Sequence, residues 1–228
     1  MLKTLEELSV DCDKASAQWM CKNVMARYMN YYTAFRMADC VALFADRADT
    51  TLETQWGCYD GIEGVKRCYL KDHGDRNDPT AAEALKGCMM IRSLDTEAII
   101  VAGDGQTARA VWMAEGAETY GMNIWNKEYA CQSFWYHGKY SVDFILENGE
   151  WKIWHLHVYN LYRSPCKSWW TICGPYQGFL LREPTCDRSV SKPIYNYSLD
   201  IPYPENEPAV PYPYETFADV EPGYGYTI

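Results

Sequence analysis

The prolines of this 228-residue chain are distributed very unevenly. Ten of the eleven lie at or beyond Pro165, and the remaining one is Pro79. Proline has no backbone N–H and a fixed φ, so it interrupts helix interiors and central strands. We therefore expect one regular domain over residues 1–164 and, over residues 165–228, an extension that forms no core of its own.

The extension is also rich in tyrosine, and its stretch 201–217 reads IPYPENEPAVPYPYETF. A stiff, extended segment that carries large amphipathic rings loses little entropy when it lies on a surface. We expect this extension to pack on the core or on a partner subunit, either on the outer face of a sheet or over the mouth of a pocket. A flexible linker is the alternative.

Within residues 1–164, apolar periodicity predicts helices first and strands later. Between Ala17 and Phe44, apolar residues recur every three or four positions, and Asp39 can cap a second segment, so two consecutive helices are expected. Further on, alternating apolar residues predict strands that turn at the short polar sequences GDGQ and NGE. The expected elements after the helices are a strand at 48–56, a short helix at 61–70, a polar loop at 72–80, and strands at 96–102, 107–116, 133–147 and 151–162.

This order of elements predicts an α+β fold. A curved antiparallel sheet has one face to bury, and the N-terminal helices supply the matching apolar surface. We expect a cone-shaped sheet wrapped around these helices and open at one end, with the Pro/Tyr-rich C-terminal extension outside it.

Charge and hydropathy exclude several classes of function. Acidic residues outnumber basic residues by 31 to 21, which gives a net charge of −10 and disfavours nucleic acid as a partner. No stretch approaches the roughly 18–20 consecutive apolar residues of a membrane span. The start of the chain carries Glu6, Glu7 and Asp11 where a signal peptide has an apolar core, so we expect a cytoplasmic protein.

Ten cysteines raise the question of metals or disulfides. None forms a CxxC pair, which is the spacing that presents two thiolates to one zinc ion. Disulfide scaffolds are typically shorter and secreted. We expect reduced, mostly buried thiols.

Four stretches within about residues 17–162 carry a family resemblance: YMNYYTAFRMADCVALFADRADTTLE, YDGIEGVKRCY, GDGQTARAVW and DFILENGEWKIWHLHVY. They resemble the nuclear transport factor 2-like superfamily. More narrowly, they are similar to its SnoaL-like group, which includes polyketide cyclases, ketosteroid isomerase, scytalone dehydratase and bile-acid 7α-dehydratase. The resemblance implies a cone-shaped barrel with an apolar pocket between the helices and the concave sheet face. It also implies a homodimer or a higher homo-oligomer, and chemistry without a cofactor.

The resemblance also assigns pocket-facing positions. In related enzymes these positions alternate along the last strand, which implies that Trp154, Leu156 and Asn160 face inward. His155 and His157 then face outward, toward a dimer surface. Two such histidines could hold a metal, but no third ligand has a suitable spacing, so no metal site is expected. The same alternation on earlier strands adds further substrate-binding positions, namely Trp112, Gly116 and Tyr140.

The chain lacks the usual catalytic set of the family. The base position of the isomerase falls at Leu52, and the dehydratase aspartate and histidine fall near Ala34 and Ser93. The next acid or histidine position falls near Gly116, and the dehydratase arginine falls at Asn160. A named activity therefore cannot be transferred from the resemblance.

Other residues can supply general acid–base chemistry. Tyr28 and Tyr32 share one helix face and can donate hydrogen bonds to an oxyanion. Glu53 can act as a base if a bulge turns it into the cone, where apolar walls raise a carboxyl pKa. His73 and Arg92 can reach the pocket from its rim. The structural alternatives are a solvent-facing Glu53, a loop position for His73, and an ion pair for Arg92.

We therefore expect a cofactor-independent lyase or isomerase that acts by general acid–base catalysis on a hydrophobic aromatic or polycyclic small molecule. Dehydration, double-bond migration and retro-aldol-type carbon–carbon cleavage all need the same base and oxyanion donor, so all three stay open. The alternative is a non-catalytic module of the same fold that binds a small molecule or another protein.

Overall fold

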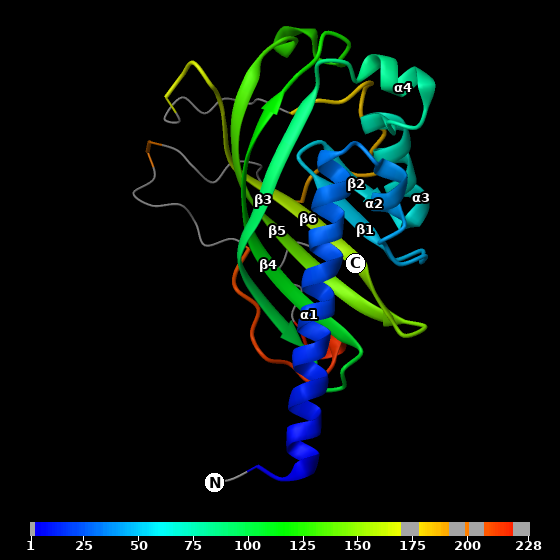
Figure 1. The fold of residues 1–228 in the computed structure, drawn as a ribbon, viewed down its shortest axis with the longest axis vertical. Helices are drawn as coiled ribbons and strands as arrows, with labels where there is room; N and C mark the ends of the chain where they lie inside the picture. Colours follow the sequence, from blue (N-terminus) through cyan, green and yellow to red (C-terminus); the bar gives the residue numbers. More distant parts are fainter. Residues whose placement is uncertain (1–2, 170–177, 192–198, 201–207, 221–228) are drawn as a thin grey trace.

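The computed structural model describes residues 3–169, 178–191, 199–200 and 208–220, whose path is shown in Figure 1. The expectations for the other parts of the C-terminal extension lie outside the described residues. The helices are α1 (Leu5–Thr33), α2 (Met37–Val41), α3 (Gly61–Lys66), the π-helix η1 (Arg67–Gly74), α4 (Pro79–Ala84), and the 3-10 helices η2 (Lys127–Tyr129) and η3 (Phe217–Asp219). The strands are β1 (Thr51–Thr54), β2 (Gly57–Asp60), β3 (Met89–Val101), β4 (Thr107–Thr119), β5 (Ser133–Glu147) and β6 (Glu150–Pro165).

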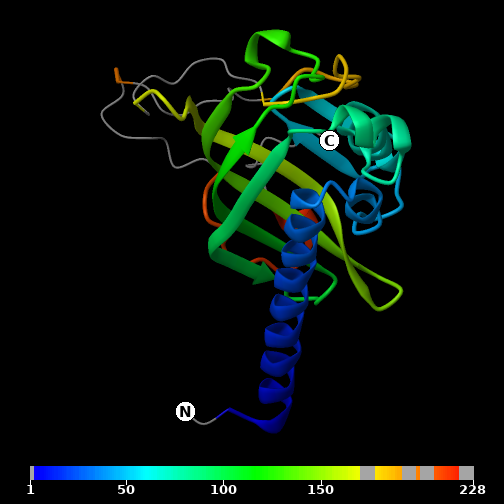
Figure 2. The same ribbon diagram turned by 45° about the horizontal axis from the view of Figure 1, so that its top comes forward.

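The strands form a curved, unclosed sheet in the order β2-β1-β6-β5-β4-β3. The turn between β5 and β6 places Asn148 and Gly149 at φ values of 52° and 80°, the left-handed pair of a tight hairpin. Helix α1 lies along the concave side and contacts both β3 and β6, as Figures 1 and 2 show. The α+β cone expected from the sequence is confirmed, with the difference that β1 runs parallel to β6.

Helix α1 begins at Leu5 rather than at Ala17. A capping box at Thr4 and Glu7 satisfies the first backbone donors of the helix. The turns that follow are exposed, so they carry no buried stripe that periodicity alone would reveal. Phe35, with φ of 56°, ends the helix and turns the chain into α2. Within the described ranges, no helix combines the length and apolarity needed to cross a membrane.

Three features between the first two helices and the long strands differ from the prediction. The expected single strand is a short hairpin, because β2 returns along β1. The helix that begins at Gly61 continues as the π-helix η1, so His73 lies in a helical turn rather than in a loop. Asp78 then caps α4 inside the expected polar loop.

A β-bulge in β6 changes which side chains face the interior. Asp143 on β5 pairs with His155, but the next residue, Phe144, pairs with Ile153, so Trp154 is the extra residue. Trp154 stacks on His155, with ring centroids 4.3 Å apart, and is partly exposed. Contrary to expectation, Trp154 therefore lies outside the pocket.

Residues 178–191 of the extension, called the strap below, cross the open end of the cone. Phe179 and Leu180 are buried there. The ring of Phe179 lies 5.7 Å from that of Phe35 at the end of α1. The strap therefore covers the interior between the helices and the sheet.

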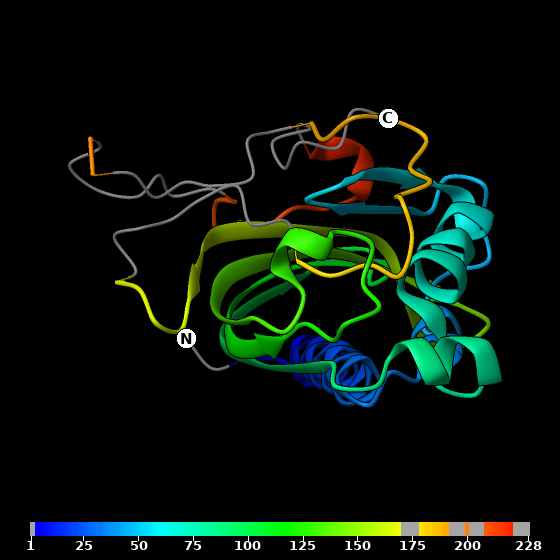
Figure 3. The ribbon, with the colours of Figure 1, turned by 90° about the horizontal axis from the view of Figure 1, so that it is seen from above.

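Residues 208–220 lie on the outer face of the sheet. Gly103 donates its amide hydrogen to the carbonyl of Tyr214, and Phe217 packs on Trp154 with ring centroids 4.6 Å apart. Figure 3 shows this segment, coloured red, on the side of the sheet opposite α1. The outer face that was expected to meet a partner subunit is thus in contact with the chain's own extension.

Gly116 has a backbone role that predicts the effect of its substitution. A Cβ at this position would lie 1.9 Å from the carbonyl oxygen of Ile91 on β3. We expect Gly116→Ala to lower the free energy of unfolding by about 1–3 kcal/mol, because the β3–β4 pairing must shift. Gly103→Ala is the matched control, since only the flexible Glu215 side chain must move there. Equal urea midpoints for both variants would contradict this role.

Candidate functional site

A small cavity lies between α1 and the concave face of the sheet, beneath the strap. Its volume is about 10 Å³, about the space of a single water molecule. The walls come from α1, the β1–β2 turn, η1, β3, β5 and β6. The lining residues are Tyr28, Tyr32, Thr54, Gln55, Trp56, Tyr69, His73, Arg92, Tyr140 and Val158.

His73 presents an unprotonated nitrogen to this cavity. Its Nδ1 donates to the carbonyl oxygen of Cys68 over 3.1 Å, which leaves Nε2 as the acceptor of a neutral ring. Burial lowers the pKa of His73 to about 4, so the ring stays neutral at physiological pH. Nε2 lies 3.4 Å from the hydroxyl oxygen of Tyr32. A base therefore faces a phenol inside the cavity.

Three buried tyrosines meet beside this base. Tyr28 and Tyr32 are one helical turn apart on α1, and their rings stack with centroids 5.9 Å apart. The hydroxyl oxygens of Tyr28 and Tyr69 are 2.6 Å apart and share a hydrogen bond. Burial raises the pKa of Tyr28, Tyr32 and Tyr69 above the usual phenol value. All three are therefore neutral hydroxyls that can donate hydrogen bonds.

A buried ion cluster forms the other side of the cavity. Arg92 donates from Nη1 to the hydroxyl of Tyr140 over 2.7 Å, and its Nη2 pairs with Glu118. Arg163 donates from Nε to the same carboxylate over 3.0 Å. Burial alone would raise the pKa of Glu118, but the two guanidinium groups hold it at about 2. The carboxylate is therefore ionised throughout the physiological range.

The structure brings several sequence-predicted site residues together at the cavity and leaves others away from it. Trp112 and Leu156 belong to the hydrophobic core, and Asn160 is buried on β6 two residues beyond Val158 of the cavity wall. Gly116 lies beside the β3 backbone, as described above. The predicted residues that line the cavity are Tyr28, Tyr32, His73, Arg92 and Tyr140.

Glu53 lies on the outer face of the sheet and does not reach the cavity. Its Oε1 accepts hydrogen bonds from the amide and the hydroxyl of Ser191, at 2.6 and 2.7 Å. His157 Nε2 lies 3.5 Å from the same oxygen. The end of the strap therefore buries a carboxylate that was expected either in solvent or, after a bulge, in the cone. On the same face, His155 pairs with Asp143 at 3.0 Å.

Sequence reasoning missed several residues around the cavity. Glu118 continues the inward alternation of β4 beyond Gly116, so that pattern could have found it. Trp56 and Tyr69 come from the hairpin turn and the π-helix, which have no simple period. Among the described side chains, no three histidine, cysteine, aspartate or glutamate residues gather as they would around a metal ion.

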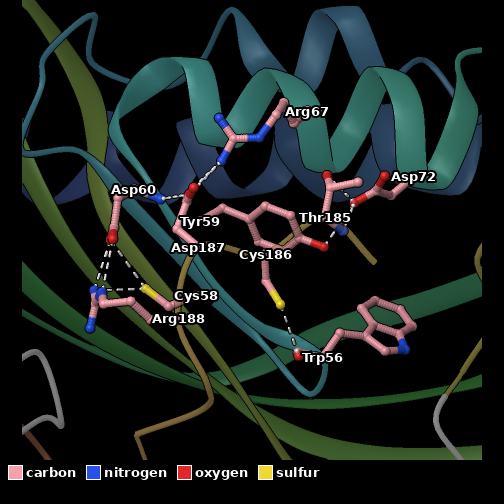
Figure 4. Close-up of polar contacts among 10 residues, drawn as sticks. All are labelled: Trp56, Cys58, Tyr59, Asp60, Arg67, Asp72, Thr185, Cys186, Asp187 and Arg188. Atoms are coloured by element: carbon pink, nitrogen blue, oxygen red, sulfur yellow. Dashed lines mark hydrogen bonds and ion pairs between the residues drawn. The ribbon is translucent and has the colours of Figure 1, made fainter. Parts of the chain in front are cut away.

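The strap is tied to the elements that surround the base, as Figure 4 shows. Thr185 donates from its amide and its hydroxyl to Asp72 Oδ2, both over 2.9 Å. Asp187 pairs with Arg67 on η1. Arg188 pairs with Asp60 at the end of β2. The π-helix η1, which carries His73, therefore binds the strap through Arg67 and Asp72.

The lowered pKa of His73 predicts a pH-dependent loss of stability. The unfolded imidazole has a pKa near 6.5 and the folded one about 4, so the unfolded chain binds more protons between these values. Stability therefore falls as the pH drops through this window, and His73→Gln should flatten the slope. Urea titrations across the window measure this effect. His137→Gln, at a half-buried ring, should change the slope less, and an unchanged slope in His73→Gln would contradict the assignment.

Loosening the strap should expose it to proteases. We expect Thr185→Val combined with Asp187→Asn to raise the rate of cleavage within the strap at least tenfold, because each lost contact is worth about 1 kcal/mol of local stability. Limited proteolysis of the folded chain measures the rate. Glu83→Gln removes an exposed ion pair with Lys86 away from the strap and serves as the control. Equal cleavage of both variants would show that these contacts do not hold the strap.

Comparison with solved structures finds the same fold in several proteins. LinA is 10% identical, with a TM-score of 0.55 over 70% of this chain and 96% of that chain. The hexachlorocyclohexane dehydrochlorinase LinA-type3 from Novosphingobium barchaimii LL02 is 12% identical, with a TM-score of 0.52 over 72% and 99%. A nuclear transport factor 2-like superfamily protein from Salmonella enterica is 19% identical, with a TM-score of 0.50 over 68% and 95%. At these identities the likeness shows the fold alone.

The family is established by sequence. No curated protein matches the chain significantly. The model of the SnoaL-like domain matches residues 13–157, which is more than half of the chain and includes most of α1 and most of the sheet. The chain is therefore a member of the SnoaL-like family.

Proposed function

We propose that this protein is a cofactor-independent lyase or isomerase that acts by general acid–base catalysis on a hydrophobic aromatic or polycyclic small molecule. The observation that carries the proposal is the neutral His73 ring, whose unprotonated Nε2 accepts from the Tyr32 hydroxyl in an aromatic cavity. Opposite this base, Arg92 and Tyr140 supply a cation and a hydroxyl. A base and an oxyanion donor on one cavity are the minimum for proton abstraction beside a carbonyl or phenol.

The proposed chemistry assigns one role to each group. His73 removes a proton from the substrate, and the hydroxyl groups of Tyr32 and Tyr140 donate hydrogen bonds to the oxygen that gains negative charge. In a dehydration the leaving hydroxyl departs as water with the proton that His73 returns. In an isomerisation that proton returns to another carbon. In a retro-aldol cleavage His73 takes the hydroxyl proton, the carbon–carbon bond breaks to give a carbonyl compound and an enolate, and His73 returns the proton to the enolate carbon. The three reactions remain alternatives within one proposal.

The structural neighbours support this class of reaction. They include a hexachlorocyclohexane dehydrochlorinase, whose name describes an elimination of hydrogen chloride. We also carry over from the family the proposal that the chain works as a homodimer or a higher homo-oligomer. The division into a domain at 1–164 and an extension at 165–228 that packs on the core or on a partner subunit is part of the same proposal.

A non-catalytic binding module is the second candidate. The cavity has room for about one water molecule, and the positions of the usual family acids hold residues such as Leu52 and Ala34. A binder would show saturable affinity for ring compounds and no turnover. The pH–rate profile separates the two candidates, because catalysis by His73 requires a rate that rises through a pH of about 4 and then levels off.

Removing the base should abolish turnover. We expect His73→Gln to lower kcat/KM by about 10²–10⁴-fold, the usual contribution of a positioned base, and Tyr32→Phe to lower it by about 10²–10³-fold. The assay is a panel of steroids, aryl-propanoids and polyketide-like phenols. His137→Gln, which alters a half-buried ring stacked on Tyr162, is the control. Turnover by His73→Gln within threefold of the wild type would refute its role as the base.

A further inference from the structure

Helix α1 carries apolar residues on two opposite sides. The side that faces the sheet is buried and includes Cys21, Tyr28 and Tyr32. A second set of residues recurs at alternating intervals of three and four positions and is exposed. At about 3.6 residues per turn, this spacing gathers the second set on the side away from the buried residues. The second set, called the α1 stripe below, consists of Leu5, Leu8, Cys12, Ala15 and Trp19.

The α1 stripe is unusual for the solvent side of a helix. Leu5, Leu8 and Trp19 are exposed by 88%, 45% and 64%. A surface helix ordinarily presents charged and polar residues opposite its buried face. The stripe instead runs along about 21 Å of the helix. A continuous run of exposed apolar side chains is typical of a surface that binds a partner.

The first turns of α1 receive little support from the core of their own chain. Residues 5–16 include no buried side chain, and Figures 1 and 2 show this end of the helix projecting past the sheet. A helix of about three turns is only marginally stable in water by itself. A partner on the α1 stripe would supply the packing that these turns lack.

The spacing of the stripe indicates that this partner is another helix. Alternating intervals of three and four residues allow the side chains of two helices to interlock at a small crossing angle. The charges of α1 then favour a second copy of the same helix. Residues 3–13 carry four carboxylates and one lysine, whereas residues 14–33 carry two lysines, one arginine and no carboxylate. Two antiparallel copies place the acidic half of each helix against the basic half of the other, and a parallel pair sets like charges together.

We propose that the α1 stripe binds the α1 stripe of a second copy of this chain, with the two helices antiparallel about a two-fold axis. One surface then serves both subunits, because each copy presents the same self-complementary stripe. On the outer face of the sheet, Phe217 of the chain's own extension already packs on Trp154, which leaves the projecting helix as the accessible apolar surface. This inference rests on the proposed homo-oligomer and names the surface that forms it.

The acidic residues at the start of α1 also have a local role. Carboxylates near a helix N-terminus are stabilised by the helix dipole, and Glu7 takes part in the capping box with Thr4. This local role requires no apolar residue on the solvent side. The exposed Leu8 and Trp19 therefore distinguish a contact between copies from a helix that is stabilised only within its own chain.

The first test measures self-association by sedimentation velocity over a dilution series. We expect a wild-type dimer, and we expect Trp19→Glu to raise its dissociation constant at least about a hundredfold, because the new carboxylate enters an apolar contact twice in a two-fold interface. Met122→Glu adds the same charge at a residue that is 69% exposed between β4 and β5, and it should leave the constant within about threefold. Leu8→Glu, on the projecting end, repeats the test if circular dichroism shows that Trp19→Glu does not fold.

The second test reads the orientation of the helices. Unlabelled chains are mixed with chains that carry a heavy nitrogen isotope, and a carbodiimide joins carboxylates to neighbouring amines without a spacer. Antiparallel helices should give mixed-isotope links between Glu7 and Lys22. A parallel pair holds these two side chains about 22 Å apart along the axis, so links at other positions without this one overturn the antiparallel arrangement.

The outcomes separate this surface from the proposed function. A monomeric wild type overturns the surface together with the homo-oligomer. A dimer that folded Trp19→Glu or Leu8→Glu leaves intact overturns the surface and keeps the homo-oligomer. Turnover is a separate readout, because the stripe lies on the side of α1 away from the cavity residues Tyr28 and Tyr32. A stripe-dependent dimer without turnover therefore supports the surface while the proposed catalysis fails.

Discussion

The contact of Glu118 with two arginines fixes the interior around which the rest of the fold is arranged. Arg92, Glu118 and Arg163 come from β3, β4 and β6, so one charged network joins three of the long strands on their concave side. In an apolar interior this attraction is much stronger than in water, and loss of one partner leaves an uncompensated charge. The network therefore holds the strand register and also supplies the polarity of a cavity whose other walls are mostly aromatic.

The sequence predicts the fold well where one period governs an element. Alternation placed the long strands, and the periodicity of α1 placed Tyr28 and Tyr32 on its buried face. The predictions are wrong where the structure departs locally from a regular helix or strand period. The bulge at Trp154 adds one residue to β6, so the residues before it face the side opposite to the one that continuous alternation predicts. The sequence records the bulge as two adjacent apolar residues, Ile153 and Trp154, which the prediction from alternation passed over. The start of α1 rests on a capping box rather than on a buried stripe, and it is visible only as Thr4 and Glu7.

The residues of the candidate site also fall into two groups, those that a helix or strand period predicts and those that it does not. Tyr28, Tyr32 and Tyr140 follow from helix and strand periods, and each lines the cavity. Glu53 could not be placed from the sequence, because its burial depends on Ser191, which lies 138 residues away in the extension. Nor could periodicity place His73, since a π-helical turn sets the direction of its ring. Contacts between distant segments are not encoded in any local pattern, and they decide which buried polar groups share a cavity.

If the protein binds a ring-containing ligand as proposed, the strap makes access to the interior an equilibrium. Phe179 packs on His73 and Tyr120, with ring centroids 6.4 and 6.2 Å apart, so a ring-sized ligand binds only to molecules in which this side chain has moved. The apparent dissociation constant is then the intrinsic one divided by the open fraction. The contacts of Thr185 and Asp187 set that fraction without touching the ligand. A large apolar ligand regains the burial that Phe179 loses, at about 25 cal/mol per Å². A small polar molecule regains none of it, so the contacts that close the cone also favour large ring systems as ligands.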